Sequence, residues 1–231
     1  MRLLLLLTGM AVLLSACDSA PPRSSSGFDS YARAAEAAPA SLFAGDAAVL
    51  SDADIDRILK YKYVPPRQTR IAVLAVGQRF WMGYSDELAR GAEDVRNAFT
   101  SLLQTSPAVT RAAYLPELLV PEKRTVAYLR EAATRNLADT LIVYQASCQT
   151  YEKSRVFSAN TAKSFCNVEA ALLDVRTGIV PFTATATEQF SLDVSASDAD
   201  SYETRQKAEL RAIRAALLKV GNDVVAYFGK G

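Results

Sequence analysis

The chain has 231 residues, with 26 Lys and Arg against 25 Asp and Glu, and it contains no His. This near balance of charge excludes the strongly basic surface that nucleic-acid-binding proteins carry. The lack of His excludes Ser-His-Asp and Cys-His catalysis, His-based metal sites and His proton shuttles, and with them most common hydrolase designs.

Residues 1–16 carry the pattern of a secretory signal peptide. One cation, Arg2, precedes an uninterrupted apolar run, and two small residues lie directly before Cys17. The run is shorter than the roughly 20 residues that a membrane-spanning helix needs. The stretch LSAC at residues 14–17 resembles the lipoprotein box of bacteria, which implies that Cys17 is lipidated and becomes the mature N-terminus. An ordinary secretory signal with an incidental cysteine stays open as the alternative.

Residues 17–48 are predicted to form the lipidated N-terminus and a flexible tether, and residues 49–231 a single α/β domain. The stretch that follows Cys17 is rich in Ser, Pro and Ala, so it has too little large apolar surface to fold alone. We therefore expect a periplasm-facing protein held at a membrane by its lipid. Asp18 favours the inner membrane under the enterobacterial sorting rule, but the outer membrane stays open.

The first part of the domain is predicted to alternate strands and helices after one short helix. The segments are a helix from the N-cap Ser51 to the prolines at 65–66, strands over 70–77, 108–116 and 139–151, and helices over 85–104 and 124–138. Apolar residues at helical spacing predict the buried faces. These are Ile55, Ile58 and Leu59 in the first helix, then Leu88, Ala92, Val95, Phe99 and Leu102 behind the cap Ser85, then Val126, Leu129, Ala133 and Leu137.

The second part is predicted to contain long strands of period two and a terminal helix. Asp174 and Gly178 bound a tight turn between the strands FCNVEAALL and IVPFTATATEQF, in which Val180, Phe182, Ala184 and Ala186 share one face. The last helix, over 198–228, has the core stripe Ala208, Leu210, Ile213, Leu217, Val220 and Val224, with Asp198, Asp200 and Glu203 at its positive end. The fold class is therefore α/β (α+β), a single domain of order β-α-β-α-β-β-β-α with a mixed sheet and a long C-terminal helix packed on it.

Two cysteines, Cys148 and Cys166, are predicted to form a disulfide, because an exported chain enters an oxidising compartment. A hairpin centred on Phe157 places Cys148 opposite Cys166, and it also aligns the apolar face. The further pairs in this register are Ala146 with Val168, Tyr144 with Ala170 and Ile142 with Leu172. Two small buried thiols that stay reduced are the alternative.

Several segments together resemble a small α/β domain shared by bacterial envelope proteins. They are RIAVLAVG, LREAATRNLADTLIVYQ and VEAALLDVRTGIVPFTATATE, followed by the long last helix. The arrangement is similar to the N-terminal domain of the Tol-system propeller protein, the curli secretion-channel lipoproteins and the lipoprotein activators of cell-wall synthases. The order of pieces resembles that of the rhombotarget lipoproteins most. The resemblance implies an envelope location and no particular activity.

Two motifs are candidate binding sites. Asp52, Asp54 and Asp56 have the spacing that begins a calcium loop, but Arg57 replaces its glycine and Tyr63 its closing Glu, so we expect no metal there. Aromatic residues gather in the loop after the first strand, a common place for a binding site in open α/β sheets. That cluster is Phe80, Trp81, Met82 and Tyr84, for which partner contact and plain packing are both open.

The sequence thus predicts a lipid-anchored, non-enzymatic envelope protein that binds a protein partner in assembly, secretion or regulation. The ten glycines form no phosphate-binding loop, and no cofactor is expected. Two alternatives stay open. A secretion-channel-like oligomer would need long membrane-crossing hairpins, and a histidine-free hydrolase would need two carboxylates across a cleft.

Overall fold

The computed structural model describes residues 50–77, 85–153, 160–195, 198 and 200–229. Its helices and strands are α2 (Asp52–Lys60), β1 (Thr69–Val76), α3 (Asp86–Leu103), β2 (Val109–Tyr114), the 3-10 turn η1 (Glu117–Leu119), α4 (Val126–Arg135), β3 (Thr140–Lys153), β4 (Thr161–Asp174), β5 (Phe182–Asp193) and α5 (Ser201–Phe228). Apart from η1, this is the predicted order. In the part of the chain that the structure describes, no helix is long and apolar enough to cross a bilayer.

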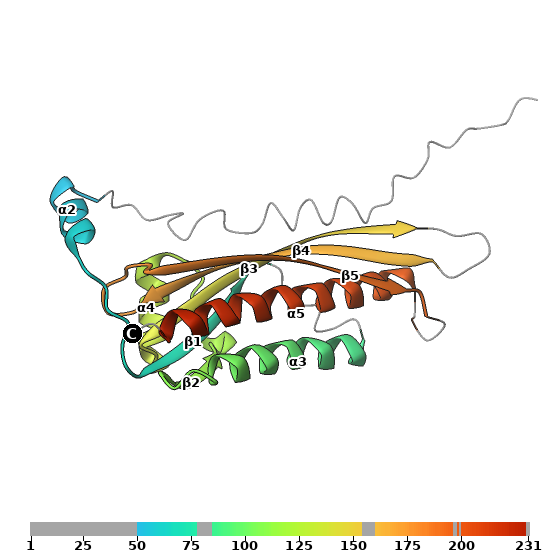
Figure 1. Ribbon diagram of the computed structural model, residues 1–231, viewed down its shortest axis with the longest axis horizontal. Helices are drawn as coiled ribbons and strands as arrows, with labels where there is room; N and C mark the ends of the chain where they lie inside the picture. The colour runs from blue at the N-terminus through green and yellow to red at the C-terminus, as the bar shows by residue number, and fades with distance from the viewer. Residues whose placement is uncertain (1–49, 78–84, 154–159, 196–197, 199, 230–231) are drawn as a thin grey trace, which may run out of the picture. The chain divides into compact units, whose positions relative to one another are not determined.

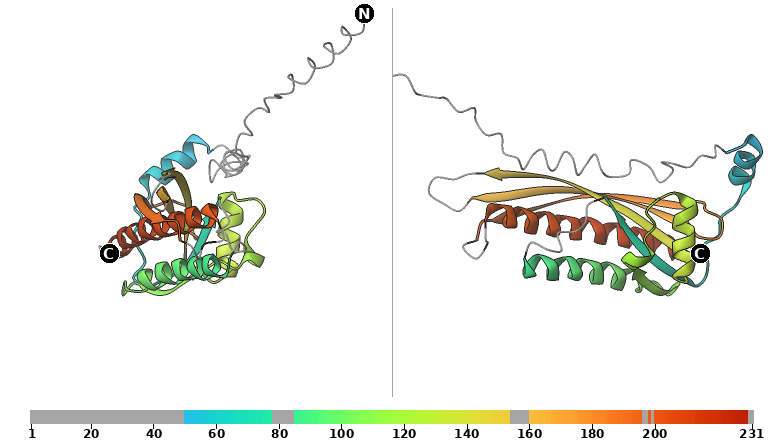
Figure 2. Two further views of the ribbon diagram at one scale, coloured as in Figure 1. Left: turned by 90° about the vertical axis from the view of Figure 1, so that its right-hand side faces the viewer. Right: turned by 180° about the vertical axis from the view of Figure 1, so that it is seen from behind.

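The sheet is mixed, with five strands in the order β2-β1-β3-β4-β5. β1 pairs in parallel with β2 and β3, whereas β3, β4 and β5 form an antiparallel meander. Helices α3 and α5 pack together on one face (Figure 1). Helix α4 packs on the other face, as the end-on view in Figure 2 shows. The predicted fold class is confirmed.

Strand β1 is buried on both faces, as its continuous apolar run predicts. Ile71 and Val73 belong to the core beneath α3 and α5, while Ala72 and Leu74 belong to a second core beneath α4. Parallel strands between two helical layers have this pattern because neither face meets water.

Helix α5 carries all six residues of its predicted core stripe in buried positions. Its close packing against α3 depends on glycine. A Cβ added at Gly221 would lie 2.7 Å from Leu102 Cδ2 and 3.1 Å from Phe99 Cε2, and one added at Gly91 would lie 2.8 Å from Leu210 Cδ2. The absent side chains let the two helices approach each other.

The start of α5 is held by a buried ion cluster rather than by the helix dipole alone. Lys207 Nζ lies 2.7 Å from Asp198, 2.6 Å from Glu87 on α3 and 3.4 Å from Glu203. Burial by itself would raise the pKa of Asp198, but the hydrogen bonds from Lys207, Thr204 and the Ser195 amide, with the charge of Lys207, together hold this pKa below its usual range. The cluster joins the β5–α5 connection to α3.

Four sequence predictions about packing differ from the structure. Leu103, one position beyond Leu102, is the fully buried residue at the end of α3. Leu137 is 63% exposed because α4 ends at Arg135 and the chain turns with a positive φ of 56° at Leu137. Val180 precedes β5 and packs with the core beneath α4, so it does not share the face of Ala184.

The fourth difference concerns α2. Ser51 caps this helix as predicted, accepting a hydrogen bond from the Asp54 amide. No residue of α2 is buried, however, and the apolar side chains expected to dock, Ile55, Ile58 and Leu59, are exposed. Helical spacing predicted the amphipathic helix correctly, but it could not show whether a surface faces it.

Candidate binding face of the sheet

The antiparallel part of the sheet has one face that no described helix covers. We call it the open face. Along β4, buried and exposed residues alternate, because the even-numbered side chains lie under α5 and the odd-numbered ones point the other way. The open face consists of Ser147, Gln149 and Tyr151 on β3, Lys163, Phe165, Asn167 and Glu169 on β4, and Thr183, Thr185, Thr187, Gln189 and Ser191 on β5.

Amides and hydroxyls dominate the open face, and they hydrogen-bond across the strands. Thr187 Oγ1 donates to Asn167 Oδ1 at 2.9 Å, and Asn167 Nδ2 in turn donates to Glu169 Oε1 at 3.2 Å. Gln145 Nε2 donates to the other carboxylate oxygen of Glu169 at 3.1 Å. These bonds connect four side chains, with two bonds across neighbouring strands and one along β4, and most side chains of the open face stay exposed to solvent.

Two aromatic rings lie together toward the free end of the β3–β4 hairpin. Tyr151 and Phe165 pack edge to face, with centroids 6.1 Å apart, and they are 59% and 36% exposed. Lys163 Nζ lies 4.8 Å from the centroid of the Phe165 ring. Exposed aromatic rings are among the residue types enriched where proteins contact partners.

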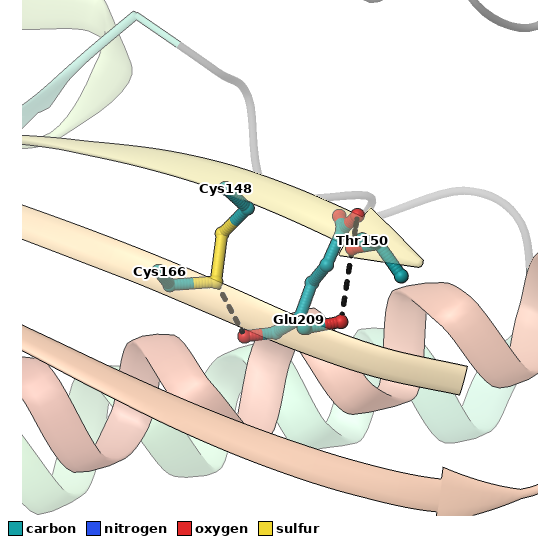
Figure 3. Close-up of a disulfide and its surroundings, with 5 residues drawn as sticks. Cys148, Thr150, Cys166 and Glu209 are labelled. Atoms are coloured by element: carbon teal, nitrogen blue, oxygen red, sulfur yellow. Dashed lines mark hydrogen bonds between the residues drawn. A yellow bond between two sulfur atoms is a disulfide. The ribbon is translucent and has the colours of Figure 1, made fainter. Parts of the chain in front are cut away.

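The opposite face of the same hairpin holds the two cysteines (Figure 3). Cys148 pairs with Cys166 in the β3–β4 register, and the three further predicted pairs are also present, so the predicted register is confirmed. The structure joins the two cysteines in a disulfide with Cα atoms 4.1 Å apart. Cys166 Sγ lies 3.6 Å from the Glu209 carbonyl oxygen, a packing contact, since a disulfide sulfur has no proton to donate.

A buried carboxyl group next to the disulfide connects the hairpin to α5. Glu209 is 3% exposed, and Thr150 Oγ1 donates to its Oε1 at 2.5 Å. Burial raises the pKa of the Glu209 carboxyl, although the bond from Thr150 and the charge of Arg205 oppose the rise. Arg205 also pairs with Glu152 on β3 at 3.2 Å. These contacts attach the back of the hairpin to the helix and leave the open face free.

Several predicted site residues lie outside the described residues. They are Cys17 and the aromatic cluster Phe80, Trp81, Met82 and Tyr84, so lipidation and partner contact at these positions stay predictions. The acids Asp54 and Asp56 pair with Arg57 and Lys60 on α2. Among the described residues, no group of three or more Cys, Asp or Glu side chains could hold a metal ion.

Sequence reasoning did not single out Tyr151 and Phe165 as exposed rings. Both lie at odd-numbered positions of strands whose buried side chains are even-numbered. This position in the alternation was the sequence signal that could have identified them as exposed. A large aromatic residue at the polar phase of a half-buried strand marks an exposed ring.

Comparisons with known proteins give structural likeness alone. No protein-family model and no curated protein matches the chain. A proposed lipoprotein from Caulobacter crescentus is 14% identical, with 70% of this chain and 92% of that chain covered and a TM-score of 0.40. The PelC dodecamer from Paraburkholderia phytofirmans is 14% identical, with 71% and 95% covered and a TM-score of 0.36. The LpoB C-terminal domain from Salmonella enterica is 14% identical, with 58% and 90% covered and a TM-score of 0.30. Likenesses this distant carry no conclusion about activity or partners.

Proposed function

We propose that the chain is a lipid-anchored, non-enzymatic envelope protein that binds a protein partner through the open face. The observation that carries the proposal is an uncovered sheet face with an exposed aromatic pair, Tyr151 and Phe165, among ordered amides and hydroxyls. Such a face offers rigid apolar anchors inside a polar surround, the composition of a partner-binding surface. A bacterial lipoprotein of the rhombotarget kind, with residues 1–16 removed and 17–48 as tether, fits this role.

The anchor has a direct test. Replacing Cys17 with Ser should move the full chain from the membrane fraction to the periplasmic fraction, since no described helix can span a bilayer. The measurement is immunoblotting of fractions after a high-salt wash. A variant from which residues 1–16 have been removed, and which still sediments with membranes, would contradict lipid anchoring.

The open face is tested with a matched pair of tyrosines. Tyr151→Ser removes the exposed ring of the open face, and Tyr128→Ser removes a 45% exposed tyrosine from α4, which packs over the parallel part of the sheet. Both variants are purified from membranes with the anchor intact, and co-purifying proteins are quantified against the parent. We expect Tyr151→Ser, and not Tyr128→Ser, to lose a partner at least tenfold. Equal recovery in the two variants would refute the open face as the contact.

A further inference from the structure

The strand β5 forms one edge of the sheet, and it is long and unprotected. Its twelve residues pair with β4 on one side only. On the other side, no backbone hydrogen bond joins β5 to another segment among the residues that the structure describes. Every second residue of an edge strand directs its N–H and C=O outward, so the outer side of β5 can template another strand.

The two edges of the sheet differ in how they are protected. Edge strands are normally blunted by shortness, charge, proline or a bulge. The other edge, β2, has six residues, carries the exposed Arg111, and has a register shift against β1 at Thr69/Arg70. β5 has an unbroken register with β4, no proline, and no charge before Glu188. Its segment 183–187 reads Thr-Ala-Thr-Ala-Thr, so every side chain in it is small.

That segment reads the same in both directions, which favours pairing with itself. We propose that β5 pairs antiparallel with β5 of a second copy of this chain, about a two-fold axis at Thr185. Thr183 then faces Thr187 of the second copy on the open face, and Ala184 faces Ala186 on the helix side. Cross-strand threonine pairs are favourable, and the small alanine side chains leave room for the second strand on the helix side of the sheet. Glu188 faces Phe182, so no like charges are opposed.

This pairing is an isologous contact, in which both copies use the same surface. It produces one continuous sheet with two open faces side by side. Partner binding through the open face would then be bivalent, which raises the effective concentration of the second contact. The pairing does not depend on the proposed function, because β5 could pair whether or not a partner binds.

The register is tested by cysteine cross-linking of the full chain in membranes. Thr185→Cys places the new thiols directly opposite each other across the two-fold axis, with Cβ atoms about 5 Å apart. The matched control Thr183→Cys lies on the same strand and face but opposes Thr187. We expect mild oxidation to give a dimer on a non-reducing gel for Thr185→Cys and none for Thr183→Cys. Equal cross-linking of both, or none of either, would overturn the proposal.

A second pair of variants tests the contact itself. Thr185→Lys places two cations opposite each other, whereas Ser147→Lys adds the same charge to the open face on β3, away from the edge. In detergent, analytical ultracentrifugation should show a dimer for the parent and Ser147→Lys, and a monomer for Thr185→Lys with unchanged circular dichroism. A monomeric parent overturns the proposal. If the monomeric parent carries a bound protein that the Thr185→Lys variant lacks, then β5 pairs with a strand of another protein instead.

Discussion

The parallel and antiparallel parts of the sheet differ in how many faces are covered. In the parallel part, β1 and the first residues of β3 lie between α3 and α5 on one side and α4 on the other. In the antiparallel part, the end of β3 continues with β4 and β5, and α5 covers one side only. A continuous apolar run produces the first arrangement, and strict alternation produces the second.

The difference separates two roles within one sheet. Residues of the parallel part are buried in one of the two cores, so substitutions there are expected to lower stability. Residues on the open face contribute little to the core, so they can contact a partner without a cost in stability. The disulfide, the Glu209–Thr150 bond and the Arg205–Glu152 pair all lie on the covered side, where they join the two strands and attach the hairpin to α5 without using the open face.

The largest effect is expected from a core residue of the parallel part. Leu141 is fully buried beneath α4, so Leu141→Ala should lower the free energy of unfolding by about 2–5 kcal/mol. Gln149→Ala, on the open face of the same strand, should change it by less than about 0.5 kcal/mol. Urea denaturation followed by circular dichroism measures both. Similar losses in the two variants would remove the distinction between the parts.

The next effect concerns the disulfide. Replacing both Cys148 and Cys166 with Ala should lower the free energy of unfolding by about 2–4 kcal/mol, because the closed loop restricts the unfolded chain. Reduction of the parent with dithiothreitol should lower it to a similar extent. Alkylation without reduction, followed by mass spectrometry, should find neither thiol free in the exported protein. Two alkylated cysteines would contradict the bridge.

The register of this hairpin was predictable because a one-residue slip would move every apolar side chain to the other face. Period two therefore determined the pairs from Ile142 to Cys148 without any structure. The ion cluster was not predictable in the same way. Glu203 and Lys207 are neighbours on a helix, but Glu87 lies 120 positions away, and only the packing of α3 on α5 brings it to Lys207.

The open face shows the same limit. Alternation predicted which side of β4 and β5 lies under a helix, and it could not predict that no described helix covers the opposite side. The exposed α2 is the converse case, because its apolar stripe predicted docking that the structure does not contain. Local patterns specify an element and its faces, whereas coverage depends on the number and place of the other elements.

A smaller effect follows from the buried carboxyl behind the hairpin. The pKa of Glu209 is raised in the folded state. Between the usual value of 4.5 and the raised pKa, the folded chain therefore keeps a proton that the unfolded chain has lost. The raised pKa stabilises the folded state fully below pH 4.5, and the free energy of unfolding falls as the pH rises toward the raised pKa. Glu209→Gln cannot ionise, so its stability relative to the parent should increase from pH 4 to pH 7. Denaturation at both pH values measures this, and a constant difference would contradict a raised pKa.

The smallest effect on stability is expected from Tyr151→Ser, the variant that we expect to lose its binding partner. The Tyr151 ring is 59% exposed, and its described ring contact is the edge of Phe165. Tyr151→Ser should therefore lower the free energy of unfolding by about 0.5–1.5 kcal/mol, the usual worth of an aromatic pair. The fully buried Tyr144, seven positions earlier on β3, gives the contrast, since Tyr144→Ala should lower the free energy of unfolding by about 3–5 kcal/mol, as for other large buried rings. If Tyr151→Ser were as costly as Tyr144→Ala in urea denaturation, the open face would belong to the core, and loss of a partner in that variant would reflect unfolding rather than a lost contact.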